Sequence, residues 1–261
     1  MLAFIVPLKS RQVSDSWIGV SQLFERCLKS VCQQSGAEFR VIVVCNERPT
    51  ISFHHPAVSY LEVDFLPTDL SFPAKGLDKG RRIVAGLVAA RDFSPTHIAI
   101  VDADDCVSKR LAGFVKQHPE SEGWFFDRGY LYKARSPSIY LRRKAFHKRC
   151  GTSHILRYSI LEFPQEGSEN RLELNQFYNE HQHISTRLEQ RGINLKRLPF
   201  IGAICIVENG ENIYQKSFQQ LHHVKPDPIS RLKDWRNFRR LTPEICQEFG
   251  LYRLEKISVD V

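Results

Sequence analysis

Residues 97–105 constrain this chain more than any other segment, because a short apolar run ends there in a group of carboxylates. The run, 97–101, is rich in β-branched residues and has the length of a buried parallel strand. Asp102, Asp104 and Asp105 follow it directly. In open α/β sheets ligands bind beyond the carboxyl ends of the strands, so we expect a ligand site here. The alternative is an ordinary solvated turn, since Asp is common in turns.

The spacing of the carboxylates favours a metal site over a simple turn. Asp102 and Asp104 are two residues apart, so a continued strand would direct both to one face. Carboxylates crowded in this way repel one another unless a cation joins them. Oxygen ligands suit Mg²⁺ or Mn²⁺, which usually also hold a substrate phosphate. Asp102 and Asp104 are therefore the predicted metal ligands.

The composition is that of an ordinary globular protein. With 261 residues, 42% hydrophobic and 25% charged, the chain suits one large α/β domain, or one domain with an appendage. Its apolar runs are too short to span a bilayer, and its first residues lack the basic flank of a signal peptide. Seven cysteines without a CxxC pair indicate a reduced, cytoplasmic protein and argue against a zinc site.

A formal net charge of +8 favours anionic partners. Positive residues are dense in 133–149 and in 231–240. Such a surface suits a phosphorylated small molecule, nucleic acid or an anionic membrane face, although solubility alone is the simpler explanation. The sequence has no zinc-finger, RRM or helix-turn-helix pattern, so we expect no nucleic-acid partner. A peripheral contact with an anionic membrane surface stays open.

Hydrophobic periodicity predicts alternating strands and helices in the first half, and hence helices packed on a mostly parallel sheet. A helical stripe from Val20 to Val31 follows capping residues at 14–16, and a loop is predicted from Phe65 to Gly80 before a helix from Ile83 to Arg91. The predicted strands are 2–8, 40–45, 58–63 and 98–101.

The second half is less regular. One or two strands are expected in 123–132, a strand mixed with basic residues in 136–146, a helix over 175–190 and an apolar strand over 198–207. Two helices are predicted in the tail, one over 228–240 and one with Thr242 as its cap and Gly250 at its end. The predicted fold class is therefore α/β, with a mostly parallel central sheet flanked by helices, a less regular second half and a helical C-terminal tail.

Several motifs now fall in a recognisable order. A strand with Pro7 near its end comes first, and the Lys-Gly-rich stretch 75–82, with Arg81, precedes the strand that ends in Asp-Ala-Asp-Asp at 102–105. Glu180-His181 precedes Gly192 by the spacing that separates a Glu-Asp pair from the glycine at its helix end in one known family. In these features residues 2–207 resemble the GT-A fold glycosyltransferases, of the nucleotide-diphospho-sugar transferase superfamily.

The resemblance implies an activity and a division of the chain. The protein would be a metal-dependent, hexosyltransferase-like enzyme that uses Mn²⁺ or Mg²⁺. It would move a sugar, with inversion, from a nucleoside-diphosphate sugar to a glycan or small-molecule acceptor. Residues 1–225 would form the GT-A-like domain, with a nucleotide-binding half at 1–106 and an acceptor half at 107–225. Residues 226–261 would be a helical appendage.

The donor-binding residues are expected at strand exits and in the basic stretch before the acidic motif. Lys79, Arg81 or Arg82 would contact the diphosphate, unless they belong to a solvated helix start. Glu47 would accept hydrogen bonds from a base N–H, unless it lies in an ordinary turn. The resemblance implies His222 as a further metal ligand, with surface exposure as the alternative. The predicted nucleotide-sugar site comprises Pro7, Lys9, Arg11, Asn46, Glu47, Lys79, Arg81, Asp102 and Ala103.

An inverting transfer also needs a general base, and Glu180 or His181 is the predicted one. This pair departs from the Glu-Asp of the family, and Asn46-Glu47 stands where many relatives carry paired Asp. Two alternatives therefore stay open. One is a non-catalytic nucleotide-binding protein. The other is a sugar nucleotidyltransferase, against which Lys9-Ser10-Arg11 argues because it lacks a glycine for a phosphate loop.

Overall fold

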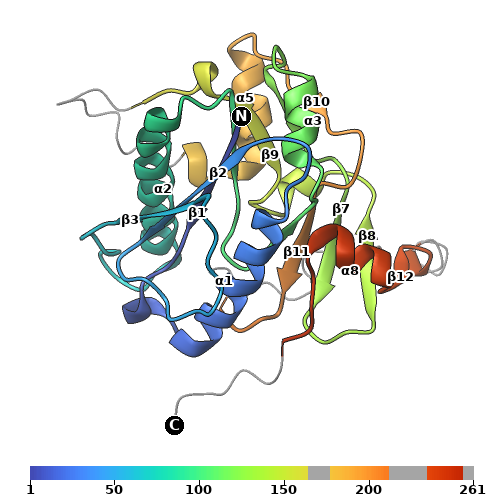
Figure 1. The fold of residues 1–261 in the computed structure, drawn as a ribbon, viewed down its shortest axis with the longest axis horizontal. Helices are drawn as coiled ribbons and strands as arrows, with labels where there is room; N and C mark the ends of the chain where they lie inside the picture. Colours follow the sequence, from blue (N-terminus) through green and yellow to red (C-terminus); the bar gives the residue numbers. More distant parts are fainter. Residues whose placement is uncertain (164–176, 212–233, 255–261) are drawn as a thin grey trace.

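A computed structural model describes residues 1–163, 177–211 and 234–254, which form two sheets with helices around them (Figure 1). The larger sheet has seven strands in the order β10-β6-β9-β4-β1-β2-β3. Strands β3, β2, β1 and β4 run parallel, while β9 is antiparallel to both β4 and β6. The strands are β1 Leu2–Pro7, β2 Phe39–Cys45, β3 Val58–Glu62, β4 His97–Ile100, β6 Gly123–Phe125, β9 His154–Arg157 and β10 Lys196–Arg197.

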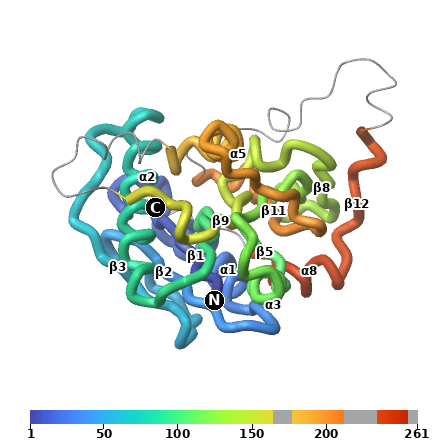
Figure 2. Tube along the Cα trace, turned by 90° about the horizontal axis from the view of Figure 1, so that it is seen from above, coloured from blue at the N-terminus to red at the C-terminus, as the bar shows by residue number. Residues whose placement is uncertain are grey.

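Helices cover both faces of this sheet because alternate residues of its strands are apolar on both sides. In β1, Phe4 packs in one core with α1 (Trp17–Cys32) and α3 (Leu111–Gln117). Its neighbour Ile5 packs in a second core with α2 (Phe72–Ala89) and α5 (His181–Gln190). Seen from above, α1 and α2 lie on either side of β1 (Figure 2). Strands buried on both faces are typical of parallel α/β sheets.

The smaller sheet has five strands in the order β12-β8-β7-β11-β5. Helix α8 (Pro243–Phe249) packs on it through Phe249, in a core with Tyr132 and Ile204. The acidic segment 101–105 is the connection between the two sheets, because β4 belongs to one and β5 to the other. The strands are β5 Cys106–Val107, β7 Gly129–Lys133, β8 Ser138–Arg142, β11 Ala203–Val207 and β12 Phe238–Arg240. Short 3₁₀ helices occupy Arg11–Val13, Ala90–Phe93, Phe146–Lys148 and Tyr158–Ile160.

The predicted fold class is confirmed as a mixed α/β fold with a mostly parallel central sheet flanked by helices. The four strands predicted in the first half all form. Helix α1 begins as predicted, since the Ser16 hydroxyl caps it by accepting the Gly19 N–H at 3.1 Å. Within the described ranges, no helix combines the length and apolar composition needed to cross a bilayer.

The loop predicted from Phe65 to Gly80 is wrong for its second half, because α2 already begins at Phe72. Ser71 caps this helix through the Ala74 N–H, and Pro73 sits in its first turn. Gly76, one of the glycines that indicated a loop, serves close packing instead. A Cβ on Gly76 would lie 2.7 Å from Nδ2 of Asn179. The stretch 75–82 is therefore helical.

The tail differs from the prediction at 238–240, which form the strand β12, antiparallel to β8, and no helix. The predicted helix over 175–190 is likewise interrupted at Glu180, whose backbone is not helical. The helix after Thr242 is confirmed. The Thr242 hydroxyl accepts the Ile245 N–H at 3.4 Å, and Gly250 ends the helix in the left-handed region at φ +60°.

Candidate active site

A cavity of about 290 Å³ opens where β1 and β4 end, close to the lower limit of typical small-molecule sites, about 300 Å³. Its walls come from five further segments: the turn before α1 with the first half of that helix, the loop before α2 and that helix, the turn at 149–151, the start of α5, and the end of β11 with the residues that follow it. The carboxyl ends of the parallel strands β1 and β4 therefore meet a ligand-sized cavity at the acidic motif.

Asp102 lies on the wall of this cavity, between α2 and the turn at 149–152. Its carboxylate pairs with the Nζ of Lys79 at 2.5 Å, and its N–H donates to the Thr152 hydroxyl at 2.9 Å. Gly151 packs against the same carboxylate, since a Cβ there would lie 2.5 Å from Oδ2. Helix α2 thus supplies the counter-charge of Asp102, and the turn fixes its backbone.

Asp104 also lines the cavity, and its environment disfavours its negative charge. Its Oδ2 accepts a hydrogen bond from Nδ2 of Asn209 at 2.6 Å. Burial, and then the neighbouring Asp102, raise the pKa of Asp104 to about 6. A divalent cation would relieve this crowding. The carboxylate oxygens of Asp102 and Asp104 are ligands that Mg²⁺ and Mn²⁺ prefer, so the residues present fit such an ion.

Asp105 has a different role from the other two carboxylates. It is only 2% exposed and accepts three hydrogen bonds: from the Ile206 N–H at 2.9 Å, the Thr152 hydroxyl at 2.7 Å and the Cys150 thiol at 3.2 Å. Burial and the two nearby aspartates raise its pKa. These contacts join β11 to the turn at 150–152. Asp105 therefore fixes the wall on which Asp102 stands.

Arg82, and not Arg81, lines the cavity from α2. The Nε of Arg82 donates to Asp78 at 2.9 Å, and its Nη2 donates to Oδ1 of Asn46 at 2.6 Å. Asn46 in turn donates to the carbonyl oxygens of Val63 and Phe65, so it anchors the loop after β3. The guanidinium of Arg81 lies over the Phe65 ring, 3.9 Å from its centroid, outside the cavity lining.

Two cationic side chains that the prediction did not select also line the cavity, Lys75 from α2 and Arg149 from the turn before Cys150. Among residues 1–163, 177–211 and 234–254, neither has an ion-pair partner. Lys9, by contrast, is paired with the carboxylate of Glu211. Lys75 belongs to the Lys-Gly-rich stretch 75–82 and Arg149 to the basic stretch 133–149, but nothing in the sequence distinguishes either residue from an ordinary surface charge.

The two candidates for the general base are separated by the structure. Glu180 forms an ion pair with Arg187 at the start of α5, and it does not line the cavity. His181, the first residue of α5, does line it. The helix is held in place by buried His154 of β9, whose Nε2 lies 2.9 Å from the Ser185 hydroxyl. Burial lowers the pKa of His154 well below its usual value, so this ring is neutral.

The structure brings together only part of the predicted set. Glu47 accepts hydrogen bonds from the Arg11 N–H and, at 3.4 Å, from the Ser10 hydroxyl, and so orders the turn after β1. His222 lies outside the described residues. Of the predicted site residues, seven line the cavity: Pro7, Lys9, Lys79, Asp102, Ala103, Asp104 and His181. Five lie outside its lining: Arg11, Asn46, Glu47, Arg81 and Glu180.

The fold and the cavity define an α/β protein with a ligand-sized cavity at the end of a mostly parallel sheet flanked by helices. No protein-family model and no curated protein matches the sequence.

Two solved structures are similar to this chain. One is TarS of S. aureus, with 16% identity over 79% of this chain and a TM-score of 0.43. This chain spans 36% of the length of that TarS chain. The other is the 2-C-methyl-D-erythritol 4-phosphate cytidylyltransferase IspD of Francisella tularensis, with 11% identity over 84% of this chain, 96% of that chain and a TM-score of 0.41. Since both TM-scores lie below 0.5, the fold class rests on the strand order and packing described above.

Proposed function

We propose that this protein is a metal-dependent glycosyltransferase that takes a sugar from a nucleoside-diphosphate sugar and transfers it to an acceptor hydroxyl. The observation that carries the proposal is the pairing of opposite charges in one cavity. Asp102 and Asp104 stand on one wall, and Lys75, Lys79 and Arg149 stand around them. Carboxylates for a cation and cations for phosphates are the two charge types that a metal-bound diphosphate requires.

Asp102 and Asp104 would hold Mg²⁺ or Mn²⁺, which supplies Lewis-acid stabilisation of the negative charge on a diphosphate leaving group. Lys79 pairs with Asp102 in the absence of the ion. With the Asp102 carboxylate engaged in holding the ion, the Lys79 ammonium group would instead pair with the phosphates. Arg149 is suited to bind a phosphate with two parallel hydrogen bonds.

His181 is the proposed general base, because it lines the cavity and Glu180 is engaged with Arg187. A neutral imidazole works near neutral pH and would take the proton of the acceptor hydroxyl as the oxygen attacks the anomeric carbon. The diphosphate departs from the opposite face of the sugar, which inverts the configuration. The acceptor would approach over the rim at Pro67, Leu70 and Phe72, where Leu70 and Phe72 are exposed.

The decisive experiment incubates the full chain with nucleoside-diphosphate sugars and Mn²⁺ or Mg²⁺, and separates the products by mass spectrometry. Release of nucleoside diphosphate with sugar on an acceptor or on water supports the proposal. Formation of sugar nucleotide from a nucleoside triphosphate and a sugar phosphate would show a nucleotidyltransferase. Metal-dependent nucleotide binding without turnover of any donor would show a binding protein. Asp104→Asn is the matched negative control in each arm.

A further inference from the structure

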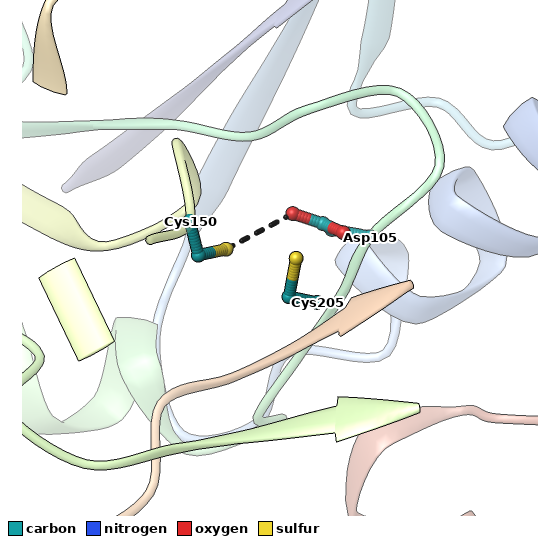
Figure 3. Close-up of side chains that lie close together, drawn as sticks. All are labelled: Asp105, Cys150 and Cys205. Atoms are coloured by element: carbon teal, nitrogen blue, oxygen red, sulfur yellow. Dashed lines mark hydrogen bonds between the residues drawn. The ribbon is translucent and has the colours of Figure 1, made fainter. Parts of the chain in front are cut away.

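A second group of potential metal ligands lies at the floor of the cavity, made of different chemistry from the Asp102–Asp104 pair. Cys150 comes from the turn at 149–152, Cys205 from β11, and Asp105 from the segment after β4. Figure 3 shows the two sulfur atoms and the carboxylate pointing toward one another from these three segments. One ligand atom of each residue lies within 4.8 Å of the other two.

These separations are close to those a tetrahedral ion imposes. With metal–sulfur bonds of about 2.3 Å and metal–oxygen bonds of about 2.1 Å, tetrahedral geometry places ligand atoms about 3.5–3.8 Å apart. The Cys150 sulfur already lies 3.2 Å from Asp105 Oδ2. Rotations that move the thiol sulfurs by about 1 Å or less would therefore complete three bonds around one ion.

The carboxylate of this group is held in place without help from the thiols. Asp105 is fixed by the Ile206 N–H and by the Thr152 hydroxyl. Only the third hydrogen bond, from the Cys150 thiol, occupies the side that faces the sulfurs. A metal ion would take the place of that thiol proton and leave the other two bonds unchanged. The site is thus preorganised around one fixed ligand.

All three residues line the cavity, so an ion can reach them and the cavity side can supply a fourth ligand such as water. Asp105 and Cys150 are buried, and Cys205 is the partly exposed member. Thiolates select soft ions such as Zn²⁺ and Cd²⁺, whereas Mg²⁺ and Mn²⁺ prefer oxygen ligands. The absence of a CxxC pair argued against such a site, but ligands from three distant segments leave no spacing to recognise.

We propose that Asp105, Cys150 and Cys205 form a site for one soft divalent cation, Zn²⁺ or Cd²⁺, at the floor of the cavity. Two thiol protons leave to solvent as the two metal–sulfur bonds form, and no oxidant is needed. The ion ties β11 to the turn that carries Arg149 and Gly151, and it lies beside the Asp102–Asp104 pair. The site does not depend on the proposed transferase activity.

The test uses the full chain, stripped of metals and kept reduced, and titrates it with Cd²⁺ while the ultraviolet charge-transfer absorption of cadmium–thiolate bonds is recorded. We expect one equivalent to bind with this absorption, to persist in excess Mn²⁺, and to raise the thermal midpoint. Cys205→Ser, at the partly exposed position, abolishes the absorption at the Cd²⁺ concentration that saturates the wild type. Cys246→Ser, in α8, leaves it unchanged.

A second measurement needs no variant. Zn²⁺ should slow the alkylation of Cys205 in the wild-type protein, located by peptide mass spectrometry, and leave the alkylation of Cys246 unchanged. The proposal is overturned if no thiolate absorption forms, if Cys205→Ser and Cys246→Ser behave alike, or if Zn²⁺ protects neither cysteine. Failure of glycosyl transfer would not affect any of these readouts.

Discussion

The charge of Asp104 gives the sharpest test of the carboxylate pair, because the same substitution should stabilise the metal-free protein and impair the metal-bound one. The pKa of Asp104 rises from an ordinary value of 3.8 to about 6, through burial and Asp102. One pKa unit corresponds to about 1.4 kcal/mol. Keeping Asp104 ionised in the folded protein therefore costs up to about 3 kcal/mol, an upper limit because the side chain retains some contact with water.

The sign of the pH dependence follows from where the protons are bound. Between pH 3.8 and about 6, folded Asp104 holds a proton that the unfolded chain has lost, so the free energy of unfolding falls as pH rises through this window. The neutral amide in the Asp104→Asn variant avoids this loss, and its oxygen can still accept the hydrogen bond from Asn209. Without metal, Asp104→Asn should gain about 2 kcal/mol more over wild type at about pH 7.5 than at about pH 4.5.

Urea unfolding in EDTA at the two pH values measures this difference directly. Asp92→Asn, which removes one exposed carboxylate outside the cavity lining, serves as the control and should change stability little at either pH. With Mn²⁺ and a nucleoside diphosphate present, the order should reverse, because the wild type gains binding energy that the variant lacks. An equal gain in the free energy of unfolding at both pH values, or an equal gain in the Asp92→Asn control, would refute the raised pKa of Asp104.

Three further outcomes are expected. Arg149→Gln should weaken nucleoside-diphosphate binding by about 1.5–3 kcal/mol, measured by calorimetry. Arg81→Gln should change that binding little, because the Arg81 guanidinium covers Phe65 outside the cavity lining. Equal losses in the two variants would mean that only the net charge of the protein matters. His181→Asn should lower turnover by about 10²–10⁴-fold at unchanged donor affinity, while Glu180→Gln should change turnover little. The reverse ranking would identify Glu180 as the general base. Gly86→Ala should destabilise the protein by about 1–3 kcal/mol in thermal unfolding, since its Cβ would lie 2.6 Å from Cγ2 of Ile5; an unchanged midpoint would show that α2 can shift.

The sequence predicted the central sheet because its strands satisfy local rules. The apolar runs at β1, β2 and β4 are short, β-branched and bounded by polar residues, and each forms where it was expected. The composition of 65–80, rich in Pro, Asp and Gly, predicts a loop, whereas α2 begins at Phe72 because Ser71 caps it and Pro73 suits its first turn. A glycine stands at position 76 of this helix where the side chain of Asn179, distant in the chain, occupies the space that a Cβ would need. Such a contact has no local sequence pattern.

The roles of the three aspartates also depend on contacts that have no local sequence pattern. Proximity in sequence suggested one cluster of three aspartates, but the fold divides them by their partners. Asp102 meets Lys79 of α2, Asp104 meets Asn209, and Asp105 turns inward to Ile206 and the turn at 150–152.

Those partners come from α2, from the turn at 150–152 and from β11 with the residues after it, all distant in the chain from 101–105. The connection of the two sheets at 101–105 therefore decides which carboxylate meets which partner. A motif of adjacent carboxylates predicts the kind of chemistry at a strand end. The assignment of roles within it requires the long-range contacts, and the substitutions at Asp104 and Cys205 therefore probe two neighbouring sites that the sequence presents as one.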